Sequence, residues 1–323
     1  MTENLFQAYL PLILWTGMGF LIVRILPQWF PRFLGRALYW VGVPLELIAL
    51  ARQSTNSNPE NIVNSPFLVP IITVLAILLS LAIASLALWG WQKISPDSQE
   101  FFRNPGSKAG FFLSAVLGNT GFIGLAIAPS LVNPESLNWA VLFSVTHNVV
   151  GPYGLGVLIA SYFSHSDQSN RWWIQLRDII TAPPLWGFII GNLIQNFKLP
   201  EIVESSLQQS VGVVIACAFL LTGIRLAQLS SWKSLKAAFL PAISRVCITP
   251  FVVGVILTLT LKTLTIPSYY CLPIVLMSGM PSAFAGLILA EEYNLDRDLI
   301  ASSILLSIII LLLVLPLWVV IFN

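Results

Sequence analysis

Long apolar runs alternate with short polar segments from one end of the chain to the other. The runs show no strict alternation of apolar and polar residues, so they fit helices better than the strands of a barrel. A helix needs about 20 apolar residues to cross the hydrocarbon core of a bilayer. We therefore predict an all-α membrane protein with ten transmembrane helices, near residues 5–25, 37–51, 67–91, 109–131, 137–162, 179–196, 203–227, 237–261, 270–290 and 299–321.

The polar stretch from Ser164 to Asp178 divides the ten predicted spans into five and five. The fourth span is interrupted at Gly118-Asn119-Thr120-Gly121, and the ninth at Ser278-Gly279-Met280-Pro281-Ser282. Asn119 and Met280 are 161 residues apart, and the same shift places the third span on the eighth and the fifth on the tenth. An odd number of helices in each copy requires two inverted repeats, which we expect at residues 1–162 and 163–323.

The composition indicates that the surroundings of the chain are lipid. Hydrophobic residues make up 56% of the 323 residues, charged ones 9%, and the mean hydropathy is +0.83. The three cysteines stand apart in apolar segments, which favours packing over metal binding or a disulfide. No basic block with interleaved aromatic residues is present, so we expect the lipid bilayer as a partner and no nucleic acid.

Loop charges predict the orientation of the chain in the membrane. One set of alternate loops carries twelve of the sixteen Lys and Arg residues, namely Arg24, Arg32, Arg36, Lys93, Arg103, Lys108, Arg171, Arg177, Arg225, Lys233, Lys236 and Arg297. The other set carries only Arg52, Lys198 and Lys262. Because basic loops stay in the cytoplasm, we expect a multi-pass protein of the plasma or inner membrane with both termini on the non-cytoplasmic side.

The two interrupted spans are the predicted substrate site. Where a helix breaks, free N–H groups of one half-helix and free carbonyl groups of the other face the gap, and the N–H ends favour an anion. Glycine permits the break in the fourth span, and Pro281 removes a backbone donor in the ninth. The substrate-binding candidates are Gly118, Asn119, Thr120, Gly121, Asn148, Ser278, Met280, Pro281 and Ser282. The alternative is that these glycines and prolines only kink or pack the helices, and that Asn148 makes an interhelical hydrogen bond.

Three ionisable residues inside predicted spans are candidates for proton or ion coupling, because such groups are costly in lipid. Glu46 is a proton carrier or counter-ion, or else an interfacial carboxylate near the outer face. His147 is a coupling group or a buried structural histidine. Arg245 pairs with a carboxylate or attracts the anion, or else its side chain extends to the nearby cytoplasmic end of the span.

The segments around both interruptions also resemble a known family. The stretch from Gly118 to Ile127, GNTGFIGLAI, is similar to the GNTGFLGLPI-type segment of the auxin efflux carrier family. Met280-Pro281-Ser282-Ala283, followed by LAEEY ending at Tyr293, is similar to the second signature of that family. Ala126 departs from the pattern, because the family usually has proline there.

The resemblance implies a ten-helix, inverted-repeat fold like that of bile-acid and Na⁺/H⁺ transporters. It also implies a homodimer held by a scaffold of the first, second, sixth and seventh helices, with the other six moving organic anions by an elevator motion. We therefore expect a secondary transporter of a small organic anion, a carboxylate or an auxin-like weak acid. The alternative is a membrane sensor that binds its ligand without transport.

We expect no enzyme, because the sequence lacks HExxH, GxSxG, a P-loop and an intramembrane pair of aspartates. We also expect no metal and no cofactor beyond a coupling ion. H⁺, Na⁺ and no coupling at all stay open as alternatives.

Overall fold

The computed structural model describes residues 2–27, 29–53, 67–164, 180–181, 183–195, 197–228 and 234–322. Within these ranges all regular elements are helices, and the backbone makes one isolated β-bridge. This confirms the all-α prediction. Most of the polar stretch between the two predicted repeats lies outside the described residues, as do Arg171, Arg177 and Lys233.

Helical segments occupy all ten positions predicted from the apolar runs. In the first half they are α1 (Thr2–Ile22), α2 (Phe30–Ala37) with η1 (Leu38–Gly42) and α3 (Val43–Gln53), α4 (Leu68–Ile94), α5 (Pro96–Phe101), α6 (Pro105–Val116), η3 (Thr120–Gly124) with α7 (Leu125–Leu131), and η4 (Pro134–Ser136) with α8 (Leu137–Asn148), η5 (Val149–Gly156) and α9 (Val157–Phe163). In the second half they are α11 (Pro183–Ile194), α12 (Glu201–Ala227), α13 (Leu235–Ile243) with η6 (Ser244–Ile248) and α14 (Thr249–Thr263), η7 (Ser268–Tyr270) with α15 (Cys271–Ser278), α16 (Ala285–Glu292) and α17 (Arg297–Phe322).

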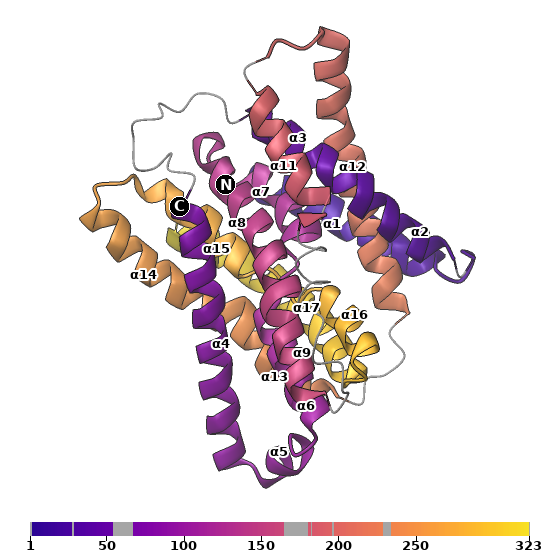
Figure 1. Ribbon diagram of the computed structural model, residues 1–323, viewed down its shortest axis with the longest axis vertical. Helices are drawn as coiled ribbons and strands as arrows, with labels where there is room; N and C mark the ends of the chain where they lie inside the picture. Colours follow the sequence, from indigo (N-terminus) through magenta and orange to yellow (C-terminus); the bar gives the residue numbers. More distant parts are fainter. Residues whose placement is uncertain are drawn as a thin grey trace.

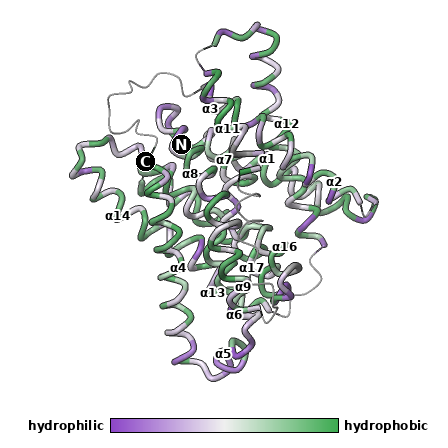
Figure 2. The backbone as a smooth tube through the Cα atoms, in the orientation of Figure 1, coloured by the Kyte–Doolittle hydropathy of each residue, from purple (hydrophilic) through white to green (hydrophobic). Residues whose placement is uncertain are grey.

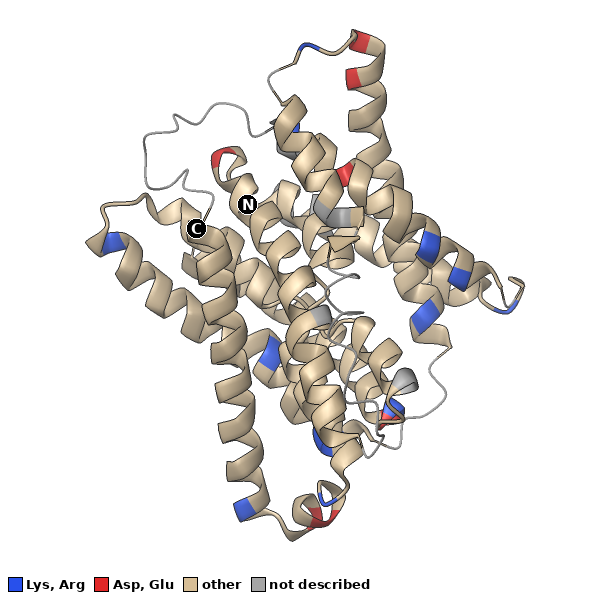
Figure 3. Ribbon diagram, viewed as in Figure 1, with Lys and Arg blue, Asp and Glu red and all other residues tan. Residues whose placement is uncertain are grey.

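Five of these helical segments are long and apolar enough to cross a membrane. They run over Leu68–Ile94, Pro134–Phe163, Glu201–Ala227, Leu235–Thr263 and Arg297–Phe322, and shorter apolar helices run over Tyr9–Ile22, Thr120–Leu131 and Ser268–Ser278. Figure 2 shows hydrophobic residues along most of the helices. In Figure 3 most charged residues lie near helix ends and in connecting segments. The chain is a multi-pass membrane protein, and the number of ten spans stays a prediction.

Short π-helical turns allow three of the long helical segments to contain proline. η1 ends two residues before Pro44, η6 ends two residues before Pro250, and η5 contains Pro152. Proline lacks an N–H group, and its ring collides with the carbonyl group one turn earlier. A π-helical turn widens the backbone at that point, so each segment continues through its proline.

The helices pack in two groups, which Figure 1 shows on different sides of the molecule. In one group α1 packs on α12 and α3 packs on α11 and α12. The other contains α4, α6, α8, α9, α13, α14, α15 and α17, which pack on one another. Small residues bring α1 and α12 close together, because a Cβ atom on Gly19 would overlap the Leu220 carbonyl oxygen and one on Gly223 that of Thr16.

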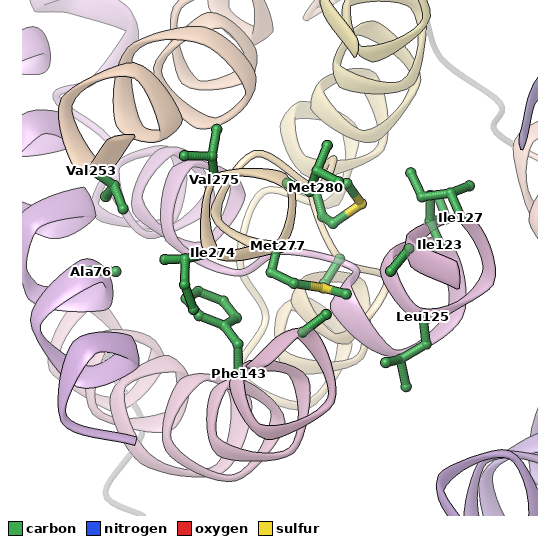
Figure 4. Close-up of a cluster of buried hydrophobic side chains, with 14 of the residues drawn as sticks. Ala76, Ile123, Leu125, Ile127, Phe143, Val253, Ile274, Val275, Met277 and Met280 are labelled. Atoms are coloured by element: carbon green, nitrogen blue, oxygen red, sulfur yellow. The ribbon is translucent and has the colours of Figure 1, made fainter. Parts of the chain in front are cut away.

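The centre of the second group is α15, in which all eight residues are buried. Figure 4 shows Ile274 and Val275 of α15 among Phe143 of α8, Ala76 of α4 and Val253 of α14. Non-helical backbone at membrane depth is tolerated only where protein or a water-filled cavity surrounds it. The packing around α15 therefore shields the point at which this helix ends.

One ion pair joins the end of α3 to the first turn of α12. Nη2 of Arg52 lies 2.7 Å from the Glu204 carboxylate, and the same guanidinium donates to the carbonyl oxygens of Ile194 and Phe197. Residue 52 and residues 194–204 therefore lie at the same end of the molecule. The loop charges predict this arrangement, since they place Arg52 and Lys198 on one side.

Candidate functional site at two paired helix interruptions

Two interrupted helices meet backbone to backbone in the middle of the second helix group. α6 ends at Val116 and the helix resumes at Thr120, whereas α15 ends at Ser278 and the helix resumes at Ala285. Between them, Gly118 and Ser282 form an antiparallel β-bridge. We call residues 117–121 and 278–283 the crossing. Both interruptions lie where Gly118-Asn119-Thr120-Gly121 and Ser278 to Ser282 predict them.

Two backbone hydrogen bonds hold the crossing together. The Asn119 N–H donates to the Pro281 carbonyl oxygen at 2.7 Å, and the Ala283 N–H donates to the Leu117 carbonyl oxygen at 2.8 Å. Four polar groups that the broken helices leave unpaired are thereby satisfied by the opposite segment. Leaving such groups buried and unpaired would cost roughly 1–3 kcal/mol each, so the two interruptions stabilise each other.

Asn119 caps the helix that follows the first interruption. Its Oδ1 accepts a 3.2 Å hydrogen bond from the Phe122 N–H. Its side-chain amide nitrogen Nδ2 is buried and has no hydrogen-bond partner among the described residues. A buried amide donor without an acceptor is costly, so the Asn119 Nδ2 atom is available for an acceptor that a ligand would bring.

Arg245 of η6 reaches the crossing from the predicted eighth span and is 2% exposed. Its Nε donates to the Met280 carbonyl oxygen at 2.9 Å, and its Nη1 donates to the Val116 carbonyl oxygen at 3.0 Å. Its Nη2 is buried without a partner among the described residues. The interpretation that Arg245 extends to the cytoplasmic end of its span is therefore wrong, because two carbonyl groups hold the guanidinium in the interior.

His147 and Asn148 are adjacent on α8, and both reach the first interruption. The His147 Nε2 accepts a 3.4 Å hydrogen bond from the Gly118 N–H, and His147 is 0% exposed. The Asn148 side-chain amide donates to the Thr120 hydroxyl at 3.4 Å and to the Ser144 carbonyl oxygen at 2.9 Å. Neighbouring helix residues point about 100° apart, and here the two side chains contact residues on either side of Asn119.

The polar side chains of the second interruption are bonded within the protein. The Ser282 hydroxyl donates to the Ser114 carbonyl oxygen at 2.7 Å, and the Ser282 N–H donates to the Ser307 hydroxyl at 3.0 Å. The Ser278 hydroxyl donates to the Val275 carbonyl oxygen of its own helix at 3.0 Å. These serines fix the position of the segment.

The side chain of Met280 is a packing group. A Cβ atom on Gly124 would lie 3.1 Å from the Met280 Cγ, and Figure 4 shows Met280 next to Met277, with Ile123 nearby. Met280 and Pro281 therefore contribute to the crossing through their carbonyl oxygens, which bind Arg245 and Asn119 respectively.

The sequence model of the family described as membrane transport protein matches residues 41–319, which include both interruptions and Arg245. The chain belongs to this family. The match confirms the resemblance to auxin efflux carriers.

Two archaeal proteins, each described only as an uncharacterized transporter, are similar to this membrane transport protein. The protein of Methanothermobacter thermautotrophicus is 28% identical over 215 residues, which cover 66% of this chain and 68% of the relative. The protein of Methanocaldococcus jannaschii is 30% identical over 215 residues, which cover 65% of this chain and 67% of the relative.

Several buried polar atoms at the crossing of this transport protein have no hydrogen-bond partner among the described residues. Asn119 Nδ2 and Arg245 Nη2 have no acceptor among the described residues, and His147 Nδ1 has no partner there either. Among the described residues, no carboxylate lies within ion-pair distance of Arg245. The crossing therefore contains a buried guanidinium without a carboxylate partner among the described residues.

Glu46 lies outside this group of donors. It is 2% exposed on α3, and its Oε1 has no hydrogen-bond partner in the described part of the chain. Protein encloses the Glu46 side chain, because α11 and α12 pack against α3. Its role as a proton carrier, counter-ion or interfacial carboxylate stays a prediction. The described residues contain no group of three His, Cys, Asp or Glu side chains that would hold a metal ion.

Sequence reasoning missed three contributors to the crossing. Ser114 and Ser307 anchor the Ser282 segment, and Leu117 supplies the carbonyl oxygen that binds the Ala283 N–H. Small hydroxyl residues within apolar spans are a signal for interhelical hydrogen bonds. Ser307, which accepts through its hydroxyl, carries that signal. Ser114 and Leu117 act through backbone carbonyl oxygens, which the sequence does not distinguish.

Proposed function

We propose that this membrane transport protein is a secondary carrier of a small organic anion, a carboxylate or an auxin-like weak acid, and that the anion binds at the crossing. The observation that carries the proposal is the pair of buried donors without acceptors, Asn119 Nδ2 and Arg245 Nη2, next to the buried imidazole of His147. A carboxylate accepts several hydrogen bonds at once and would accept charge-assisted hydrogen bonds from the free Nη2 of the guanidinium. Thr120, Asn148 and the backbone of Gly118 and Gly121 would border the bound group.

The transport cycle in this proposal is an elevator motion within two inverted five-helix repeats, residues 1–162 and 163–323. The two interruptions fall in the fourth and ninth predicted spans, at corresponding places of the two proposed repeats, and their backbones pair at the crossing. Two inverted copies of one interrupted helix are expected to cross in this way.

The helices pack in two groups. This packing supports the proposal that one group stays fixed during the transport cycle and the other moves. α1, α2, α3, α11 and α12 would form the scaffold, which we expect to hold a homodimer in the membrane. The helices around the crossing would carry the anion from one side to the other. We keep the predicted orientation, with both termini on the non-cytoplasmic side.

Uptake into proteoliposomes tests the proposal. A panel of labelled carboxylates that includes an indole-type aromatic acid should show time-dependent uptake above that of protein-free liposomes. Imposed Na⁺ and pH gradients would distinguish Na⁺ coupling, H⁺ coupling through Glu46 or His147, and uncoupled transport. The alternative function, a ligand-binding sensor, predicts carboxylate binding to the purified protein without any uptake.

Two asparagine variants provide the matched comparison. Asn119→Ala removes the free amide donor and should abolish uptake. Asn192→Ala removes an asparagine of α11 whose amide donates to the Phe188 carbonyl oxygen, away from the crossing, and should leave uptake intact. Transport by Asn119→Ala at the rate of the parent would refute the assignment of the site.

A further inference from the structure

We propose that the Arg245 guanidinium is a built-in cation that occupies the carbonyl side of the crossing, so that this carrier needs no alkali cation there. The inference rests on the proposed function in taking the crossing as the substrate site. It adds the source of the positive charge and predicts that Na⁺ does not bind at this point. The starting observation is that one side chain binds the Val116 and Met280 carbonyl oxygens together.

The two carbonyl groups mark the negative ends of the two half-helices. Val116 is the last residue of α6, and Met280 follows α15 by two residues. Each helix C-terminus carries the equivalent of roughly half an elementary negative charge. The two ends facing one another therefore approach roughly one negative charge, which a single guanidinium balances. Without the guanidinium, the Val116 and Met280 carbonyl groups would face each other without a hydrogen-bond donor.

The space at the crossing is shaped for the guanidinium. A Cβ atom on Gly118 would overlap Nη2 of Arg245 and lie 2.5 Å from its Cζ and 2.9 Å from its Nε. Residue 118 therefore has to be glycine because the guanidinium occupies the volume of a side chain at that position. This requirement is separate from the backbone freedom for which the sequence suggests glycine.

An alkali cation would compete for the same oxygen atoms. Hard cations are held by several oxygen ligands, above all carboxylates and backbone carbonyls. At the crossing, two carbonyl oxygens already bind Arg245, and those of Pro281 and Leu117 bind backbone N–H groups. Among the described residues, Glu46 is the buried carboxylate, and it lies on α3 in the other helix group. The four carbonyl oxygens that Na⁺ would use at the crossing are therefore committed.

The planar fork of arginine suits this role better than lysine. Nε and Nη1 point to two different carbonyl oxygens, while Nη2 stays free for an anion. An ammonium group is a compact point charge and does not fix two acceptors and a ligand in one plane. We therefore expect Arg245→Lys to keep the positive charge but not to bind both carbonyl oxygens and an anion in one plane.

Thermal unfolding of the purified protein in NaCl, KCl and choline chloride at equal concentration tests the proposal. The parent should have the same melting temperature in all three salts. Arg245→Met removes the charge and should melt several degrees lower in choline chloride and regain part of that loss in NaCl. Arg103→Met, which removes an exposed arginine, should behave like the parent.

A melting temperature of the parent that rises in NaCl relative to choline chloride would overturn the proposal. The same holds if Arg245→Met is as stable as Arg103→Met in every salt. Should Arg245→Met fail to fold, Arg245→Lys takes its place. It should melt lower than the parent and equally in the three salts, and a rise in NaCl would count against the proposal.

The unfolding measurement requires no substrate, so the two proposals fail separately. Absence of carboxylate uptake would refute the proposed function and leave the melting temperatures interpretable. A Na⁺-stabilised parent that still transports carboxylates would refute the role of Arg245 as built-in cation alone.

Discussion

The Ser107 hydroxyl donates a 2.7 Å hydrogen bond to the carboxylate of Asp296, which lies 189 residues later in the chain. The other Asp296 oxygen accepts from the Leu299 N–H at 3.0 Å, so Asp296 caps α17 and holds the start of α6 beside it. Tyr269 donates an equivalent 2.7 Å hydrogen bond to Glu135, which joins the start of η7 to the helix that begins at η4. Asp296 follows Glu135 by 161 residues. The two contacts support the proposed inverted repeat at positions remote from the crossing.

Loss of the Asp296 contacts should destabilise the protein. Asp296→Ala removes a helix cap, which contributes about 0.5–2 kcal/mol, and the partner of the Ser107 hydroxyl. We expect a lower melting temperature by thermal unfolding. Asp298→Ala, an exposed neighbour in the same helical turn, should change stability little. Equal melting temperatures for the two variants would show that the contact with Ser107 is dispensable.

Gly118→Ala should disrupt the crossing although the substitution adds a single methyl group. The new Cβ atom would overlap Nη2 of Arg245, so the guanidinium would have to leave its carbonyl partners. Insertion of a methyl group into a well-packed interior typically costs 1–3 kcal/mol. We expect lower thermal stability and loss of carboxylate uptake. At Gly90 a Cβ atom would meet nothing within 4 Å, so Gly90→Ala is the control. Normal uptake by Gly118→Ala would contradict the position of the guanidinium.

Asn119→Asp should separate the structural role of Asn119 from its role toward an anion. The carboxylate retains an oxygen that accepts from the Phe122 N–H, so the helix cap is preserved. It replaces the free donor Nδ2 with a negatively charged acceptor that repels an anionic substrate. We expect uptake to fall to the level of protein-free liposomes while the variant still folds, as measured by size-exclusion chromatography. Retained uptake would place the anion elsewhere.

The contact between α1 and α12 should tolerate no side chain at Gly223. A Cβ atom there would overlap the Thr16 carbonyl oxygen, which is backbone and moves only if the two helices separate. Gly223→Ala should therefore lower the melting temperature. Gly212 lies on the same helix with nothing within 4 Å of its Cβ position. Gly212→Ala should be neutral or more stable by up to about 1 kcal/mol, because alanine favours helix. The opposite order of stability would contradict this packing.

The apolar runs were sufficient to locate the helices, because the length and hydrophobicity of each segment are local properties. The interruptions at Gly118 and Pro281 were equally predictable, since glycine and proline act on their own backbone. The proposed repeat also follows from the sequence spacing of these two interruptions.

Side-chain directions within the helix groups were not predictable in the same way. Arg245 could extend toward water or toward the interior, and only the packed helices show two carbonyl groups within its reach. His147 and Asn148 are adjacent on a helix and so point in different directions, yet both contact the crossing, one at Gly118 and the other at Thr120. The partners of Ser282 come from helices 168 and 25 residues away, which no local pattern indicates.

The paired backbone hydrogen bonds also constrain how the protein is made. Leu117 and Asn119 are synthesised long before Pro281 and Ala283, which complete their pairing. Until the later segment enters the membrane, the first interruption has polar backbone groups in hydrocarbon with no partner. We expect a nascent chain that stops before residue 281 to remain with the insertion machinery or to be degraded. The two halves therefore depend on each other during biosynthesis, and neither is expected to persist alone in the bilayer.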